Sequence, residues 1–216
     1  MLIGGENAVR ADSNTAILDG LPEMLAIMIA ATLVLMLFAF RSIVLPIKAV
    51  AMAGLSLTAT LGVLTWVFVD GHGAGLLGIE PRPLPASAII MVIAVTFGLS
   101  TDYEVFLVAR MVEAHDKGAD TAEAVRKGMA TTGRVITAAA ALLVIVTGAA
   151  GLSEVALMKI AGFGMALAIV IDATIVRMLL VPALVTLMGP ANWWMPGRST
   201  PTELEDVAEP TRVSDP

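Results

Sequence analysis

The sequence contains no cysteine, only two histidines and one tyrosine, and charged residues make up only 15% of its 216 residues. Without cysteine the chain has no disulfide framework, no thiol nucleophile and no cysteine-bound metal. Aromatic residues are also scarce, at 5%, and no basic patch is interleaved with them. These absences exclude a disulfide-stabilised domain and a cysteine-dependent enzyme, and they leave nucleic-acid binding without support.

Apolar residues, by contrast, make up 57% of the chain, and the mean hydropathy is +0.87. A soluble globular domain is far less apolar than this. Five apolar segments each have about the ~20 residues that a helix needs to cross a bilayer. We therefore predict an all-α membrane protein with a five-helix transmembrane bundle over residues 21–189, with helices at about 21–40, 44–69, 85–109, 135–153 and 155–188.

The segments outside these five helices are polar. Residues 1–20 are too short for a domain of their own, and we predict that they are the end of a larger one. Asp120 and Glu123 form a capping pair, which predicts a short amphipathic helix over about 120–131 that lies along the cytoplasmic face of the membrane. The acidic segment 190–216 is predicted to be a disordered cytoplasmic tail.

The lysines and arginines between the helices predict the orientation of the chain, because they are enriched on the cytoplasmic side. If the amino terminus is outside, the inner segments hold seven of them: Arg41, Lys48, Arg110, Lys117, Arg126, Lys127 and Arg134. The outer segments then hold only three: Arg10, Arg82 and Lys159. We therefore predict a plasma-membrane protein with its amino terminus outside and its carboxy terminus in the cytoplasm.

The third predicted helix carries Asp102, Tyr103 and Glu104 within its apolar segment. A charged group in the hydrocarbon costs a few kcal/mol or more, so an ionisable residue there is a candidate functional site. Because this setting disfavours the carboxylate, Asp102 is predicted to load and release protons, steadied by a hydrogen bond from Tyr103. Glu104 lies about 200° from Asp102 around the helix, so it is expected to pair with a neighbouring helix or to reach water on the inner side.

Small residues precede the acids of the third and fifth helices at a spacing of four: Ala94 and Gly98 before Asp102, and Gly164 and Ala168 before Asp172. Positions four apart share a helix face, and small residues let membrane helices approach closely. The spacing predicts that both acids lie on packed faces and point into the bundle rather than towards lipid.

Asp172 is followed by Arg177 on the same predicted helix. Five residues correspond to about 140° of rotation in an α-helix, so an ideal ion pair between the two is not expected. A purely structural role stays open for both acids, in which a buried carboxylate is satisfied by Thr137 or by Arg177. We assign supporting polar roles to Ser100, Glu104, Asp172 and Arg177.

Three stretches carry a more specific signal: FGLSTDYEVFLVAR, AVRKGMATTGRVITAAA and IVIDATIVRMLLVPALVTLMGPANWWMP. In this order they resemble the MMPL family of the resistance-nodulation-division (RND) superfamily of transporters, and together they cover about half of the chain. The chain resembles the last five of the twelve transmembrane helices of such a transporter.

The resemblance implies proton-driven export of lipids or other amphipathic molecules across the plasma membrane. Asp102 and Tyr103 match the proton-carrying Asp-Tyr pair of the second half of these transporters, and Asp172 and Arg177 match polar positions of the last helix. Residues 1–20 would end an external porter domain. The other helices and both porter domains are missing, so the chain is expected to be incomplete alone. Its expected partners are membrane lipids, protons as the coupling ion, and the missing amino-terminal half or an upstream gene product, without a cofactor or a metal.

Two other classes of function stay open. A non-transporting membrane scaffold for envelope-assembly enzymes would use the surface helix and the tail, and Asp102 would then be only structural. An intramembrane enzyme would need Asp102 and Asp172 to share one water, or Ser100 to have a histidine in the membrane. No Gly-Asp motif occurs, and His72 and His115 lie in predicted loops, so no enzymatic activity is expected.

Overall fold

The computed structural model describes residues 6–72, 75, 78 and 80–194, and all regular elements within these ranges are helical. Five helical segments are long and apolar enough to cross a membrane: Asp12–Phe40, Val44–Val69, Ala86–Asp116, Thr121–Ala150 and Ala156–Trp193. The prediction of an all-α bundle with five membrane-spanning helices is therefore confirmed.

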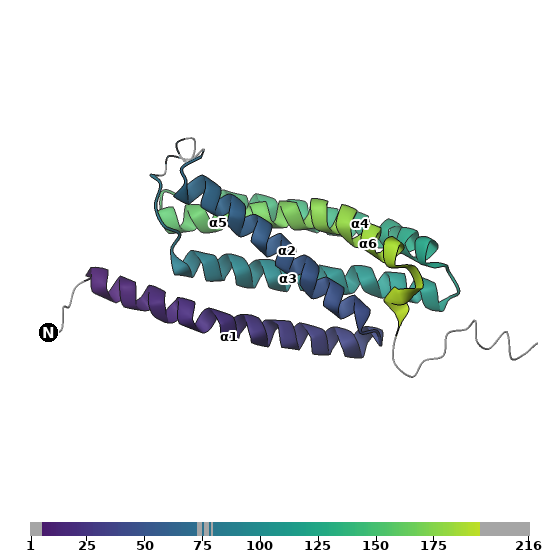
Figure 1. Ribbon diagram of the computed structural model, residues 1–216. Helices are drawn as coiled ribbons and strands as arrows, with labels where there is room; N and C mark the ends of the chain where they lie inside the picture. The colour runs from purple at the N-terminus through teal and green to yellow at the C-terminus, as the bar shows by residue number, and fades with distance from the viewer. Residues whose placement is uncertain (1–5, 73–74, 76–77, 79, 195–216) are drawn as a thin grey trace, which may run out of the picture.

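Successive spans run in opposite directions along one bundle (Figure 1). The elements are, in chain order, α1 (Glu6–Phe40), α2 (Val44–Leu64), the π-helical η1 (Thr65–Val69), α3 (Ala86–Asp116), α4 (Thr121–Ala150), α5 (Ala156–Ile171), the π-helical η3 (Asp172–Leu180), α6 (Val181–Met188) and the 3-10 helix η4 (Gly189–Trp193). The last four follow one another without a gap, and we call them the last span.

The two ends of the bundle differ in what they hold. At the Arg41 end, α1 stops and α2 starts, and the α3–α4 loop and η4 lie at the same end (Figure 1). Arg41 has a φ of 48°, a left-handed conformation that cannot continue an α-helix, so α1 ends there. Ser42 Oγ donates a hydrogen bond to the carbonyl oxygen of Asn192 at 2.7 Å and joins this turn to η4. The opposite end, the Gly71 end, holds the loop after η1 and the α4–α5 turn.

The predicted surface helix over about 120–131 is not a separate element. The Asp120 side chain does cap a helix, because it accepts a hydrogen bond from the Glu123 amide at 2.7 Å. That helix is α4, however, which continues without a break to Ala150. Gly128 lies so close to α3 that an added Cβ would be 2.6 Å from Met111 Cγ. This contact holds the polar first turns of α4 against α3 instead of along the membrane face.

Two other predicted boundaries also differ from the structure. α1 already begins at Glu6, inside the segment expected to end another domain, and α3 ends at Asp116 rather than near residue 109. His115 consequently belongs to the last turn of α3 and not to a loop, and its half-buried ring stacks on Trp193 with centroids 4.2 Å apart. The assignment of residues 1–20 to an external domain stays a prediction. The predicted disordered tail 190–216 is wrong at its start, because η4 extends to Trp193 and Asn192 is buried there. Residues 195–216 lie outside the described part.

The core contains two apolar layers, one where α2 and η1 meet α3 and α5, and one where α3 and α4 meet the second half of the last span. The layer nearer the Gly71 end consists of Leu64, Val67, Phe68, Ala88, Val92, Ile160, Ala161 and Met165. The layer nearer the Arg41 end consists of Leu107, Met111, Val125, Ile136, Val176, Val181 and Val185. Along α3 and along the last span, the buried polar residues Ser100 and Asp172 fall between these two layers.

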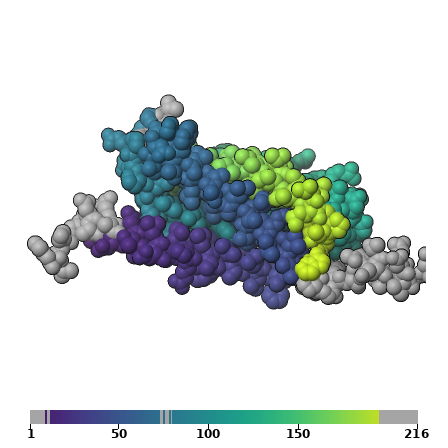
Figure 2. All heavy atoms as spheres, in the orientation of Figure 1, coloured from purple at the N-terminus to yellow at the C-terminus, as the bar shows by residue number. Residues whose placement is uncertain are grey.

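The outer surface is apolar, as a lipid-facing surface requires. Phe38, Leu142 and Leu187 are among its most exposed large side chains. In the space-filling view, α2 runs diagonally across one face of the molecule, between α1 and the last span (Figure 2). The bundle therefore presents hydrocarbon outwards as well as in its two core layers, and it encloses a small number of buried polar groups.

Candidate functional site

An ion pair lies at the centre of the last span. Arg177 Nε donates a hydrogen bond to Asp172 Oδ2 at 2.7 Å, and Nη2 lies 2.6 Å from the same oxygen. Both side chains are buried. The prediction that a spacing of five residues would prevent an ideal pair is wrong, because Asp172–Leu180 is π-helical. A π-helix closes i→i+5 hydrogen bonds, so its residues five apart return to the same face.

Contacts with α3 complete the surroundings of this pair. Ser100 Oγ donates to Asp172 Oδ1 at 2.7 Å, and Arg177 Nη2 donates to the carbonyl oxygen of Ser100 at 2.8 Å. Both oxygens of Asp172 therefore accept hydrogen bonds from charged or polar donors. Removing one partner of a buried ion pair costs ~3–5 kcal/mol, because the other charge is left uncompensated. The pair thus fixes the last span against the middle of α3.

Tyr103 also contacts the pair. The guanidinium of Arg177 lies over its ring, 4.9 Å from the centroid, an arrangement that stabilises by about 0.5–2 kcal/mol. The side chain is half-buried, so it lies at the margin of the polar interior. Tyr103 therefore joins the Asp172–Arg177 pair to the part of α3 that carries Asp102.

Asp102 itself is exposed, and so are Ala94 and Gly98. An added Cβ on Gly98 would meet no atom within 4 Å. The expected packing of this face, which we call the outward face of α3, is therefore not found among the described helices. The physical reason lies in the bundle itself: α2, α4 and the last span cover the opposite side of α3. α1 also packs against α3, but it leaves Ala94, Gly98 and Asp102 exposed.

The matching face of the last span is packed. Ala168 is fully buried, and an added Cβ on Gly164 would lie 3.0 Å from side-chain atoms of both Leu64 and Val92. The small residues before Asp172 therefore allow α2 and α3 to approach α5, whereas the small residues before Asp102 have no partner in the described part of the chain. Small residues precede the acid at a spacing of four in both helices, but this face is packed in the last span and exposed in α3.

Glu104 lies on the other side of α3 from Asp102, as the rotation of about 200° predicts. It is buried, and so is Lys48 of α2, whose positive charge acts on it. Thr96 and Ser100 are buried on the same side, each four residues apart from the next. Thr96, Ser100 and Glu104 thus form an inward polar face of α3.

Sequence reasoning missed two members of this interior. Lys48 was counted only as a loop charge that sets orientation, although α2 already begins at Val44. Thr96 was not singled out. Its spacing of four from Ser100, repeated from Ser100 to Glu104, is the signal that could have revealed the inward polar face.

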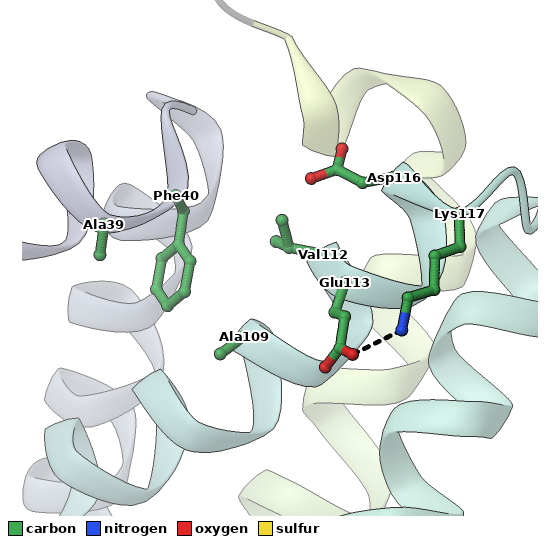
Figure 3. A pocket seen from close by; sticks show the side chains of 7 residues that line it. All are labelled: Ala39, Phe40, Ala109, Val112, Glu113, Asp116 and Lys117. Atoms are coloured by element: carbon green, nitrogen blue, oxygen red, sulfur yellow. Dashed lines mark hydrogen bonds and ion pairs between the residues drawn. The ribbon is translucent and has the colours of Figure 1, made fainter.

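A surface pocket of about 360 Å³ lies apart from these residues, between the end of α1 and the end of α3. Its lining residues point towards one another in Figure 3 and comprise Ala39, Phe40, Ala109, Val112, Glu113, Asp116 and Lys117. Glu113 accepts a hydrogen bond from Lys117 at 2.6 Å and another from Arg110 at 2.7 Å. These exposed charges pair with one another at the surface. We therefore assign the pocket no role in the buried polar site.

The sequence profile of the MMPL family matches residues 1–206. The chain belongs to the MMPL family. The resemblance of the three stretches to this family of the RND superfamily is thereby confirmed, and the MMPL chain is a multi-pass membrane protein with transporter relatives.

Curated relatives agree with this assignment. The MMPL chain is 54% identical over 196 residues to the trehalose monomycolate exporter MmpL3 of Mycolicibacterium smegmatis. It is 50% identical over 196 residues to the protein of the same name from Mycobacterium tuberculosis, and 35% identical over 197 residues to membrane protein YdfJ of Bacillus subtilis. Each match covers 91% of this chain, but only 19%, 21% and 27% of the respective relatives. The chain therefore spans about a fifth to a quarter of their length.

Proposed function

We propose that this MMPL chain is the carboxy-terminal membrane part of a proton-motive-force-driven exporter of lipids or other amphipathic molecules. The observation that supports this most strongly is the outward face of α3, where exposed Asp102 follows exposed Ala94 and Gly98 inside a membrane-spanning helix. Such a face requires a partner that the described helices do not supply.

The energetic argument concerns the Asp102 carboxylate. A charged side chain at the centre of a membrane helix costs ~2.5–3.5 kcal/mol on insertion scales and much more on an isolated helix in simulations. Residues of this kind face the interior of a bundle in membrane proteins. The small residues before Asp102 permit the close approach of another helix. This chain matches only 19%, 21% and 27% of the length of the three relatives, so a missing membrane segment of the same transporter is the partner that we propose.

Asp102 and Tyr103 are the proposed proton-relay residues. Asp102 would lie at the interface with the missing part and exchange the proton, while Tyr103, the next residue, contacts Arg177. A change in the charge of Asp102 would therefore act, through Tyr103, on a buried ion pair that fixes the last span to α3. Each proton that crosses 100 mV supplies ~2.3 kcal/mol, so more than one proton or an added pH gradient would drive the export of one lipid.

The proposed location is the plasma membrane, with the amino terminus outside. Seven of the lysines and arginines of the bundle and its loops lie towards the Arg41 end, which supports a cytoplasmic position for that end. Two relatives carry the name trehalose monomycolate exporter, which supports an amphipathic cargo. We assign no enzymatic activity to the chain.

The test replaces Asp102 by Asn in the full-length transporter that contains this chain. Export of a fluorescent lipid and proton uptake would be measured in proteoliposomes with an imposed pH gradient. Asp102→Asn is expected to abolish both, since an amide cannot carry the proton. Asp120→Asn is the matched control, because it makes the same change in the α3–α4 loop and asparagine caps a helix as well as aspartate does. Proton-driven export that survives Asp102→Asn would contradict the proposal, and loss of assembly without a specific loss of export would favour a scaffold.

A further inference from the structure

The inward polar face of α3 contains polar side chains that do not contact the Asp172–Arg177 pair. Thr96, Ser100 and Glu104 are exposed by only 3%, 2% and 3%, and they extend over about 12 Å of the helix. Only Ser100 contacts the ion pair directly. Glu104 lies one turn further towards the Arg41 end, and the buried Lys48 of α2 is among the charges that act on it.

Several polar atoms of this interior have no hydrogen-bond partner among the described residues. They are Lys48 Nζ, Glu104 Oε1, Thr96 Oγ1, Ser56 Oγ and Arg177 Nη1. Buried polar groups in native proteins are nearly always satisfied, so each exception calls for an explanation beyond packing. Here the exceptions include a carboxylate and an ammonium that are both more than nine-tenths buried.

The charges around Glu104 come from two neighbouring elements. The charges that act on Glu104 are those of Lys48 of α2 and of Arg177 and Asp172 of the last span. With Glu104 ionised, two cations and two carboxylates balance one another in this interior. With Glu104 protonated, one positive charge is in excess. The protonation state of Glu104 is therefore coupled to the charge of the Asp172–Arg177 pair.

The position of Glu104 along α3 indicates the end of the bundle to which it would release a proton. Lys48 lies in the second turn of α2, close to the turn at Arg41. Ser42 and Asn192 close the bundle there through their hydrogen bond. Glu104 and Lys48 thus occupy the level between the central ion pair and the Arg41 end, on the side of α3 that faces away from Asp102.

We propose that Glu104, held opposite Lys48, is a second proton-exchange residue that connects the Asp172–Arg177 level with water at the Arg41 end. The Glu104 carboxylate binds a proton that comes from the centre of the bundle and becomes a neutral acid, and it then releases the same proton to water at the Arg41 end. Lys48 keeps its own proton throughout and offsets the charge of the carboxylate. This proposal rests on the proposed proton-driven export and adds an internal step to it.

The first test uses Glu104→Gln in the full-length transporter, reconstituted in liposomes with a pH-sensitive dye inside. We expect the rate of gradient-driven proton uptake to fall at least tenfold. Glu113→Gln on the same helix, whose carboxylate is exposed and paired with Lys117 and Arg110, should stay within twofold of the wild type. Proton uptake within twofold of the wild type in Glu104→Gln would overturn the proposal.

Two further variants separate proton exchange from a structural role. Glu104→Asp keeps a titratable carboxyl and should restore at least part of the proton uptake. The double variant Lys48→Met with Glu104→Gln removes both buried charges and should fold even if Glu104→Gln alone does not, because no uncompensated Lys48 charge is then left in the interior. We expect it to be as inactive in proton uptake as Glu104→Gln. A folded double variant with wild-type proton uptake would refute a role for Glu104 in proton exchange.

A spectroscopic readout distinguishes this inference from the proposed function. Infrared difference spectra of the full-length transporter in nanodiscs, recorded across pH 5 to 9, should contain a protonated-carboxyl band that disappears in Glu104→Gln and shifts in frequency in Glu104→Asp. Absence of this band in the wild type would overturn the inference without reference to transport. If Asp102→Asn abolishes export while Glu104→Gln does not, only the internal step fails. If neither variant affects export, the proposed function fails.

Discussion

The two faces of α3 carry acids at nearly the same depth, yet their surroundings are opposite. On the inward face, Glu104 is buried beside Lys48, and Ser100 contacts the Asp172–Arg177 pair. On the outward face, Asp102 is exposed, and so are the two small residues that precede it at a spacing of four. The inward face is covered by other helices of this chain, and we propose that further protein covers the outward face. Mutations on the two faces should therefore differ in which property they change, stability or coupling to the missing part.

The largest effect on stability is expected from Arg177→Met. It leaves the buried Asp172 without its cation, so the free energy of unfolding should fall by ~3–5 kcal/mol. Asp102→Asn is the outward-face counterpart and should change the stability of the isolated chain by less than about 0.5 kcal/mol. Denaturant unfolding in detergent micelles, followed by tryptophan fluorescence, measures both. Equal losses for the two variants would remove the distinction between the faces.

The second expected effect concerns the two glycines that precede the acids of α3 and the last span. Gly164→Leu adds a side chain where a Cβ alone would already lie 3.0 Å from Leu64 and Val92. Such overpacking costs about 1–3 kcal/mol. Gly98→Leu makes the same change where no atom lies within 4 Å of the added Cβ, and it should leave the isolated chain as stable as before. In the full-length transporter, by contrast, Gly98→Leu should impair export, because it obstructs the approach of the partner helix.

Sequence reasoning succeeded where a local rule acts alone. The second span was predicted over 44–69 and occupies Val44–Val69, because a long run that is uncharged from residue 49 to 69 leaves the backbone no alternative to a helix in lipid. The Asp120 cap was also correct, since capping depends only on neighbouring residues. The family was recognised from three motifs that retain their order.

Failures occurred where the result depends on neighbours or on a rare backbone geometry. The Asp172–Arg177 pair was judged unfavourable because the α-helical period was assumed, and no propensity rule signals a π-helix over Asp172–Leu180. The burial of Asp102 was argued from the cost of its charge. That argument identifies a requirement of the whole transporter, which the described part of this chain does not meet by itself.

A smaller effect on stability is expected from Ser100→Ala. This change removes the hydroxyl that donates to Asp172 Oδ1, while Arg177 still pairs with the other oxygen. The free energy of unfolding should fall by about 1–2 kcal/mol, as for the loss of one hydrogen bond to a buried charged group. Thr101→Ala, one residue further along, is the control, because its hydroxyl only donates back to the carbonyl of Phe97 in its own helix. If Thr101→Ala lowers the free energy of unfolding as much as Ser100→Ala does, the hydrogen bond from Ser100 to Asp172 stabilises the protein no more than one within a helix.

The smallest effect on stability, and the sharpest test of the outward face, is expected from Ala94→Cys. The sequence contains no cysteine, so one introduced thiol is the only site in this chain that a maleimide can label. Ala94 is exposed in the isolated chain, and a membrane-soluble maleimide should label it there as fast as Leu142→Cys on the lipid-facing side of α4. In the full-length transporter, made free of other cysteines, labelling at position 94 should slow at least tenfold while labelling at position 142 stays unchanged. Equal labelling of both positions in the full-length protein would mean that lipid covers the outward face, and Asp102 would then need another explanation for its place in the membrane.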